Sequence, residues 1–314
     1  MVEQQAPVRP APEPPERPPR PSRARILARR AVALILLAGV LAFVGLIGFA
    51  IAGVLHVGDK PKPKPTPIVA PPSLRIIFPE GFTRAEMAER IRAVNQIARS
   101  KRKINPKLSA KTYLSATASS KLPGTFAGDG RRRQLEGFLF PSTYEFEPRT
   151  TSRQLVKRQL DAFHENWDQV DLAYATSKNL TPYDVLIIAS IVEKEVIAPE
   201  ERPLVAAVIY NRLHAGMNLG IDATTRYGLH VPGTEPLLES QLNSTNPYNT
   251  RNPNIKGLPP TPIANPGLAS MQAAAHPAKV DYLYYVRKPD KLHHFFTADA
   301  DEFCRKAREY GYGC

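Results

Sequence analysis

An apolar run over residues 31–55, "AVALILLAGVLAFVGLIGFAIAGVL", is the most uniform pattern in the chain and contains no charged residue. A helix of this composition exceeds the roughly 20 residues needed to span the hydrocarbon core of a bilayer, so the run predicts one transmembrane helix. Its N-terminal flank carries Arg23, Arg25, Arg29 and Arg30. By the positive-inside rule, this flank stays in the cytoplasm and the later residues are exported. A cleaved signal peptide would have an apolar core of only about 7 to 15 residues, so the pattern favours a retained anchor.

Two proline-rich segments border this run. Residues 1–30 are dominated by Pro, Arg and Glu, a composition that cannot bury enough apolar surface to offset its ordering entropy, so we expect a disordered tail. Residues 56–72 contain alternating Lys and Pro, which favours an extended spacer. The globular part of the protein is therefore expected after this spacer.

Beyond the spacer, the pattern changes between strand-like and helix-like periods, which predicts an α+β fold. "LRIIFPEG" is a strand candidate, and Thr83 with Glu86 three residues later is a capping box that opens a helix over 84–97. "GDGRRRQLEGFLFPSTYEFE" is expected to be an irregular connection. A later helical stripe has apolar residues at Leu155, Leu160, Phe163 and Trp167. We divide this part into a small module over 73–132 and a larger domain over 133–314.

The stretch "VLIIASIVEKEV", which ends at Val196, is apolar for eight residues and then carries two carboxylates. Thr181 and Pro182 predict the start of this helix. At 100° per residue, Glu195 lies on the most apolar side, so we expect it to be more desolvated than Glu193. Desolvation raises the pKa of a carboxyl toward the range in which it donates a proton near neutral pH. Alternatively, both carboxylates pair with nearby Lys and Arg, the commoner outcome for an arbitrary Glu pair.

The residues after this helix have the composition of a carbohydrate-binding cleft. A helix from Pro203 to about His214 is expected to lead into an extended stretch that ends at Asp222, Thr224 and Tyr227. Long segments rich in Asn, Pro, Gly and Tyr follow. Aromatic faces stack on sugar rings and amides bind hydroxyls. Ordinary turn chemistry explains the Pro and Gly, but it explains the density of Tyr and Asn less well.

Charge and cysteines exclude little. The formal net charge of +13 suits a polyanion, a membrane surface or a cell-wall polymer, so charge alone selects no partner. Cys304 and Cys314 lie ten residues apart without a CxxC spacing or clustered His, so we expect no metal and no cofactor. A local disulfide and two unpaired thiols are equally compatible with these two cysteines.

Several motifs, taken in order, resemble a known family. "EGFLFPSTYEF", "IIASIVEKEV", "ERPLVAAVIYNRL", "GMNLGIDATTRYG" and "YNTRNPNIKGLPPTPIANPG" are similar to motifs of the endolytic murein transglycosylases of the YceG/MltG type, and the similarity covers 74–297. The resemblance implies that 73–132 is a LysM-like module and that 133–314 is a YceG-like catalytic domain. It also implies non-hydrolytic cleavage of the bond between N-acetylmuramic acid (MurNAc) and N-acetylglucosamine (GlcNAc). In this reaction one glutamate protonates the glycosidic oxygen and then takes the proton of the muramyl C6 hydroxyl, which leaves a 1,6-anhydro end.

We assign this acid and base role to Glu195 because it is the more desolvated carboxyl, and we interpret Glu193 as a supporting carboxylate. Polar positions that match the family are candidate substrate-binding residues: Asp222, Thr224, Tyr227, Tyr248, Asn249, Asn265 and His294.

The resemblance implies peptidoglycan glycan strands as the substrate and termination of nascent strands as the role. It implies an inner-membrane protein with a cytoplasmic N-terminus and a periplasmic catalytic domain. Peptidoglycan synthases are candidate partners, and no nucleic-acid partner is expected. Two other functions stay open. One is a non-catalytic peptidoglycan-binding scaffold, and the other is a hydrolytic muramidase in which Glu193 or Asp222 activates water.

Overall fold

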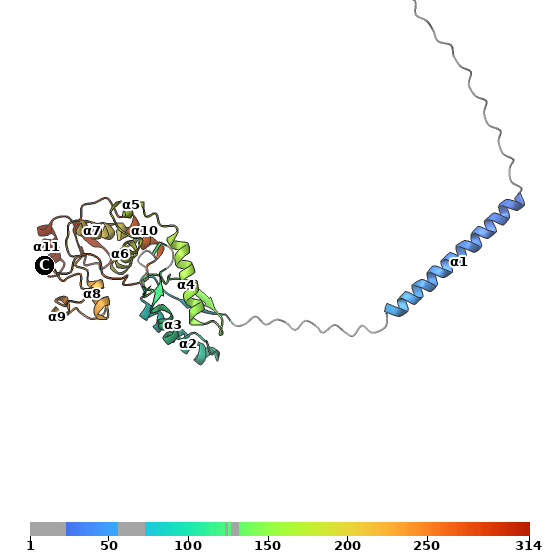
Figure 1. Ribbon diagram of the computed structural model, residues 1–314, viewed down its shortest axis with the longest axis horizontal. Helices are drawn as coiled ribbons and strands as arrows, with labels where there is room; N and C mark the ends of the chain where they lie inside the picture. The colour runs from blue at the N-terminus through green and yellow to red at the C-terminus, as the bar shows by residue number, and fades with distance from the viewer. Residues whose placement is uncertain (1–22, 56–72, 123–124, 127–131) are drawn as a thin grey trace, which may run out of the picture. The chain divides into compact units, whose positions relative to one another are not determined.

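A computed structural model of the chain describes residues 23–55, 73–122, 125–126 and 132–314. The spacer expected over 56–72 lies outside the described residues, as does most of the tail expected over 1–30. The described residues fall into two units, one containing helix α1 (Arg23–Leu55) and the other everything from residue 73 onward (Figure 1).

Helix α1 is continuous, and its segment Arg30–Ile51 is long and apolar enough to cross a membrane. Its described large apolar side chains are exposed, which suits a lipid environment. A helix satisfies its backbone hydrogen bonds internally, as the bilayer interior requires. The apolar helix expected over 31–55 is therefore present, and it begins eight residues earlier, at Arg23.

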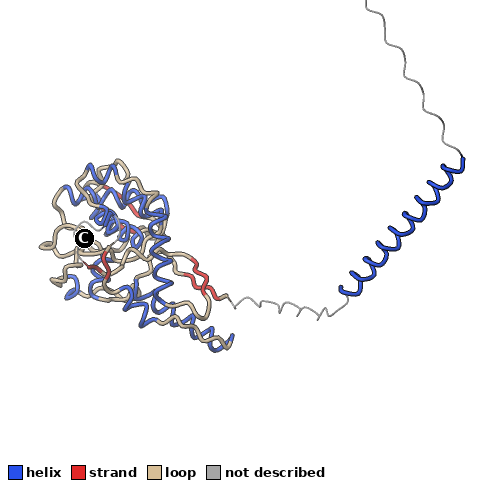
Figure 2. Tube along the Cα trace, turned by 45° about the vertical axis from the view of Figure 1, so that its right-hand side comes forward, coloured by secondary structure: helices blue, strands red, loops and turns tan. Residues whose placement is uncertain are grey.

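The second unit mixes helices and strands, so the expected α+β class is confirmed, and helices and loops make up most of it (Figure 2). The helices are α2 (Arg84–Arg102), α3 (Ala110–Thr117), α4 (Ser152–Trp167), α5 (Ala173–Ser177), α6 (Pro182–Glu195), η2 (Pro199–Glu201), α7 (Arg202–His214), α8 (Asp222–Leu229), α9 (Glu239–Leu242), α10 (Leu268–Ala275) and α11 (Ala300–Glu309). The described strands form three antiparallel pairs, β1 (Leu74–Ile77) with β4 (Thr143–Phe146), β2 (Ser120–Lys121) with β3 (Arg132–Arg133), and β5 (Tyr284–Arg287) with β6 (His294–Thr297).

Strand β4 lies in a segment that we expected to be irregular, and this expectation was wrong. Tyr144 and Phe146 are buried while Thr143 and Glu145 are exposed, the alternation typical of a half-buried strand. Leu74 of β1 pairs with Phe146. The β1–β4 pair therefore joins the start of the expected module to the expected catalytic domain, and the boundary between 132 and 133 stays a prediction.

The predicted helix starts are confirmed by their caps. The hydroxyl of Thr83 accepts the Glu86 amide at 3.2 Å, and the Glu86 carboxylate accepts the Thr83 amide at 2.7 Å. Helix α2 continues beyond the expected end near Ile97 to Arg102, where Lys103 adopts a left-handed conformation. Thr181 caps α6 in the same way, with Pro182 at the first position.

Helix α6 forms the centre of the core. Every residue from Val185 to Val192 is buried, and the helix packs against α7 and α10 (Figure 1). An α-helix that is apolar all round must be covered on every side. Ser190, the polar residue in this run, donates to the Ile187 carbonyl and accepts the Ile263 amide, so the loop before α10 is fixed to α6.

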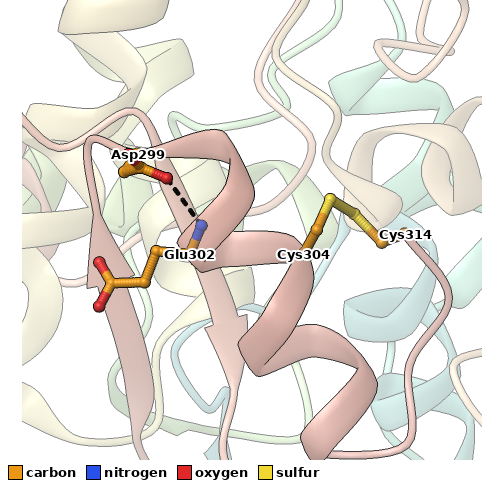
Figure 3. Close-up of a disulfide and its surroundings, with 4 residues drawn as sticks. All are labelled: Asp299, Glu302, Cys304 and Cys314. Carbon is orange, nitrogen blue, oxygen red and sulfur yellow. Dashed lines mark hydrogen bonds between the residues drawn. A yellow bond between two sulfur atoms is a disulfide. The ribbon is translucent and has the colours of Figure 1, made fainter.

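The C-terminal residues are held by a disulfide. Cys304 of α11 is bonded to Cys314, which answers the question that the sequence left open (Figure 3). The Asp299 carboxylate caps α11 by accepting the Glu302 amide at 2.7 Å, as Figure 3 shows. Helix α11 packs on β5 and β6. The disulfide therefore secures the helix that supports this hairpin.

We predict that replacing both cysteines, as Cys304→Ser with Cys314→Ser, lowers the melting temperature of the purified protein. Loop-closure entropy for a loop of this size corresponds to about 2 to 3 kcal/mol. Calorimetry should show the same decrease in wild-type protein treated with a reductant. An unchanged melting temperature in both samples would contradict a stabilising role.

Candidate active site

Glu195 is the last residue of α6 and faces the β5–β6 hairpin. The helix stops there because Val196 is extended, with φ of −99° and ψ of 130°. The hydroxyl of Tyr285 on β5 donates to Glu195 Oε2 at 3.1 Å, and Arg287 donates to the Glu195 carbonyl at 3.2 Å. Tyr285 and Arg287 are two residues apart on one strand, so both side chains lie on the same face. The hairpin thereby fixes both the side chain and the backbone of Glu195.

Burial raises the pKa of the Glu195 carboxyl, the direction expected from its place on the helix. The nearby carboxylate of Asp222 raises this pKa further. The Tyr285 hydroxyl, the Arg287 guanidinium and the backbone amide of Ala223 oppose the rise, because each of them favours the charged carboxylate. Burial therefore favours the protonated form of Glu195, and the three nearby donors can stabilise the carboxylate once the proton has left.

Glu193 has different surroundings. Its Oε2 accepts the Gly267 amide at 3.1 Å, just before α10. Burial, and next the charge of Glu193, raises the pKa of Glu80, a carboxyl that packs against Gly267. A Cβ at position 267 would lie 1.9 Å from Glu80 Oε1, so a larger residue there would displace the Glu80 carboxylate. The two carboxylates of the motif thus serve different sides of α6.

The stretch expected to be extended up to Asp222 and Tyr227 is partly helical, so this expectation was wrong. Helix α8 begins at Asp222, whose acidic side chain in the first turn favours a helix start. The exposed carboxylate of Asp222 accepts Arg251 at 2.8 Å. Thr224 is buried, and its hydroxyl bonds to the Ile221 carbonyl, which satisfies a polar group inside the fold.

Tyr227 and Tyr248 form a half-buried aromatic pair with ring centroids 5.2 Å apart. Tyr227 follows Ala223 by one helical turn, so both lie on the same side of α8. The backbone amide of Ala223 is close enough to Glu195 to lower the pKa of its carboxyl. Tyr227 therefore lies one helical turn beyond the residue of α8 that approaches this carboxyl. Tyr248 is fixed by a 2.8 Å hydrogen bond between its hydroxyl and that of Thr261. This pair offers aromatic surface near the carboxyl on which a sugar ring could stack.

Three other predicted substrate-binding residues are enclosed within the protein. Asn249 donates to the Leu242 carbonyl at 2.8 Å and is fully buried. Asn265 accepts the Leu139 amide at 2.9 Å. His294 is 4% exposed, and its Nδ1 lies 2.6 Å from the carboxylate of Glu201. These side chains, like that of Thr224, hold segments of the site in place, whereas Asp222, Tyr227 and Tyr248 are partly open.

The ring of His294 packs edge to face against the ring of Tyr285, with the two ring centroids 5.3 Å apart. Burial lowers the pKa of His294, which favours the neutral ring with its Nδ1–H donated to Glu201. The backbone amide of His294 also donates to Glu201, at 2.8 Å. This buried pair therefore fixes β6 and supports the tyrosine that contacts Glu195.

Comparison with known proteins identifies the family. The sequence matches the model of the YceG-like family over residues 61–309. The chain belongs to the YceG-like family.

Relatives of this YceG-like protein include the endolytic murein transglycosylase of Bacillus subtilis, 31% identical over 226 residues that cover 69% of this chain and 59% of that protein. The endolytic murein transglycosylase of Streptococcus pneumoniae strain R6 is 34% identical over 187 residues, 58% of this chain and 33% of that protein. A crystal structure of a YceG-like protein from Listeria monocytogenes superimposes with a TM-score of 0.60 at 28% identity, covering 74% of this chain and 75% of that one. The match thus spans 59% of the Bacillus relative and a third of the Streptococcus relative.

The sequence motifs of the YceG-like protein included one buried acid that we did not single out. Glu136 is 3% exposed and accepts hydrogen bonds from the Arg84 amide, the Asn265 side chain and the Tyr227 hydroxyl. Burial raises its pKa to about 7, although these donors oppose the rise. A carboxyl between leucine and glycine in "LEGFLF" was the available signal, because an ionisable group in an apolar segment requires partners.

Two further features bear on the site. Among the described residues, no cluster of three or more His, Cys, Asp or Glu side chains could hold a metal. A cavity of about 660 Å³ is lined by residues from several elements, and those it takes from α6 are Tyr183, Asp184 and Ile187. These residues lie in the first two turns of α6, whereas Glu195 ends the helix, so this cavity is separate from the carboxyl.

We predict that Glu136→Gln changes how stability depends on pH. A folded-state pKa of about 7, above the ordinary 4.5, means that the folded protein binds this proton more tightly than the unfolded chain. The unfolding free energy of wild type should therefore fall by up to roughly 3 kcal/mol as pH rises across this window and then level off. Glutamine does not titrate, so this contribution should be absent from denaturant unfolding of the variant. Parallel pH profiles for the two proteins would contradict the prediction.

Proposed function

We propose that this protein is an endolytic peptidoglycan lytic transglycosylase that cleaves MurNAc–GlcNAc bonds without water and leaves 1,6-anhydro-MurNAc ends. Membership of the YceG-like family supports the proposal, as do the relatives named endolytic murein transglycosylase. The observation that carries it is the carboxyl of Glu195, whose pKa is raised by burial and whose Oε2 accepts the Tyr285 hydroxyl, on the side of α8 that carries the aromatic pair.

The proposed reaction uses one carboxyl twice. Glu195 gives its proton to the glycosidic oxygen as the bond to muramyl C1 breaks. The resulting carboxylate then takes the proton of the C6 hydroxyl, whose oxygen bonds to C1 and closes the anhydro ring. The Tyr285 hydroxyl donates to Glu195 Oε2, so it stabilises the charge that exists only between the two proton transfers.

Roles for the other residues follow from their surroundings. We assign substrate contact to Asp222, Tyr227 and Tyr248, which are partly open. We propose that Glu193 is a supporting carboxylate, because it accepts the Gly267 amide and keeps the loop before α10 against α6. The enclosed residues position the site from within: Thr224, Asn249, Asn265 and His294.

The hydrolytic alternative has less support from these contacts. A muramidase needs a second carboxylate free to activate water. Asp222 is paired with Arg251, and Glu193 is bonded to Gly267 on another side of α6. The scaffold alternative leaves the raised pKa of Glu195 without a use.

We further propose that α1 anchors the protein in the inner membrane and that residues 73–314 act in the periplasm. The uncharged span of α1 and the arginines before it support this orientation. The Cys304–Cys314 disulfide agrees with an oxidising compartment. In this proposal the LysM-like module over 73–132 binds glycan, the enzyme terminates nascent strands, and peptidoglycan synthases are its candidate partners.

We predict that Glu195→Gln lowers anhydro-muropeptide release from purified sacculi by at least about 10²-fold, because the amide keeps the shape but cannot transfer a proton. Mass spectrometry of the released muropeptides measures the effect. The matched variant Glu193→Gln should lose less activity. With the wild-type protein, reducing ends in place of anhydro ends would support the muramidase, and an absence of any cleavage product would support the scaffold.

We predict that the wild-type rate falls as pH rises through the raised pKa of Glu195, because the enzyme then loses the proton it must donate. Tyr285→Phe removes a donor that favours the charged carboxylate, so the alkaline limb should move to higher pH. Tyr284→Phe, on the other face of β5, is the matched control and should leave the limb in place. A shift toward lower pH in Tyr285→Phe would contradict the assigned hydrogen bond.

A further inference from the structure

The Glu136 carboxylate lies where three segments distant in sequence meet. Its Oε1 accepts the Arg84 amide at 3.0 Å and the Asn265 side-chain amide at 2.9 Å, while Oε2 accepts the Tyr227 hydroxyl at 3.1 Å. These donors belong to the start of α2, the loop before α10, and α8. With 3% of its surface exposed, Glu136 is closed to a substrate, so any role in the reaction acts through the groups that it holds.

Two of the three partners, Asn265 and Tyr227, lead to the proposed site. Asn265 lies two residues before Gly267, whose amide donates to Glu193. Tyr227 is half of the aromatic pair with Tyr248 and lies on α8, whose first turn acts on Glu195. The hydroxyl of Tyr227 donates to Glu136, so this bond anchors the polar end of the ring while packing against Tyr248 holds its face.

The direction of these hydrogen bonds depends on the charge of Glu136. The Arg84 backbone amide can only donate. Asn265 must also donate to Glu136 through Nδ2, because its Oδ1 already accepts the Leu139 amide. A proton on Glu136 can therefore be received only by the Tyr227 oxygen, whose own hydrogen must turn away. Protonation thus replaces a charge-assisted hydrogen bond with a neutral one, which is roughly half as strong.

The ionisable groups around Glu136 do not compete for this role. Arg84 from α2 is permanently charged, and its guanidinium donates to Thr117 and Gln134. Burial raises the pKa of Tyr113 from α3 and of Tyr227 from α8 above the ordinary value for a phenol, so both stay neutral below pH 10. In this group of described residues, which comprises Glu136 and the side chains that face it, Glu136 is the one that titrates near neutral pH.

We propose that Glu136 is a positioning residue for glycan binding, whose ionised carboxylate holds the Tyr227 ring against Tyr248 so that a sugar ring can stack on the pair. The proposal rests on the proposed function, because it takes a glycan as the ligand. It assigns a role to the acid of the "EGFLF" motif that the reaction itself does not use. It also makes glycan affinity depend on pH, with tighter binding when Glu136 is charged.

Calorimetric titration with soluble, uncrosslinked peptidoglycan glycan strands tests this proposal in the full chain in detergent. The Glu195→Gln background prevents cleavage and removes the titration of that carboxyl. Affinity should fall by about fivefold to tenfold as pH decreases from 8.5 to 5.5, with a midpoint near pH 7. Adding Glu136→Gln should give the weaker affinity at every pH, because glutamine keeps a neutral bond to Tyr227. Adding Glu145→Gln, an exposed carboxyl on β4, is the matched control and should keep the wild-type profile.

Tyr227→Phe provides a second, independent test, since Glu136 keeps its bonds to Arg84 and Asn265 in that variant. It should also abolish the pH dependence, and combining it with Glu136→Gln should weaken binding no further. A pH profile that persists in Glu136→Gln, or losses that add in the double variant, would overturn the positioning role while leaving the proposed function intact. A complete lack of glycan binding in the Glu195→Gln background would instead overturn both.

Discussion

The need to cover the apolar middle of α6 governs the arrangement of the unit from residue 73 onward. From Val185 to Val192, α6 has no face that tolerates water, so α7, α10 and the loop around Ile263 surround it. The packing against α6 is tight at Gly137, because a Cβ there would lie 2.7 Å from Pro262 and 3.3 Å from Leu186 of α6. The last turn of this helix carries the two acids of the motif, and Glu195 there is still covered by the β5–β6 hairpin. The desolvation that raises the pKa of Glu195 is therefore a consequence of core packing.

Burial of acids recurs in the unit with a consistent remedy. Glu136, Glu195 and Glu201 each receive hydrogen bonds from neighbouring elements, and the donors include both backbone amides and side chains. Each acid thereby links segments that no strand ladder joins. The described strands of this unit are short, so hydrogen bonds to these carboxylates connect segments that a larger sheet would join in other folds.

Local chemistry explains which parts of the fold were predictable. The starts of α2 and α6 were predictable because Thr83, Glu86 and Thr181 form capping hydrogen bonds with residues three positions away in the sequence. Helix α8 was missed because adjacent β-branched threonines favour extended structure, whereas in the fold the Thr224 hydroxyl is buried against Ile221 and Thr250. Strand β4 was missed although Tyr144 and Phe146 alternate, since its partner is about 70 residues away. Similarly, a sequence cannot tell whether an asparagine amide faces a ligand or a carbonyl, and the amide of Asn249 faces carbonyls.

The β1–β4 pair has a mechanical consequence. The chain that arrives from the anchor enters the core at Leu74, and β1 has only four residues, followed closely by the buried Phe78. In the proposed membrane-anchored enzyme, tension on the chain that precedes residue 73 would first load these few backbone hydrogen bonds and the side chains of Leu74 and Ile76. Because β4 leads back to the segment that contains Glu136, the first place to yield under load would also be structurally connected to the acid that we propose positions the Tyr227 ring for glycan binding.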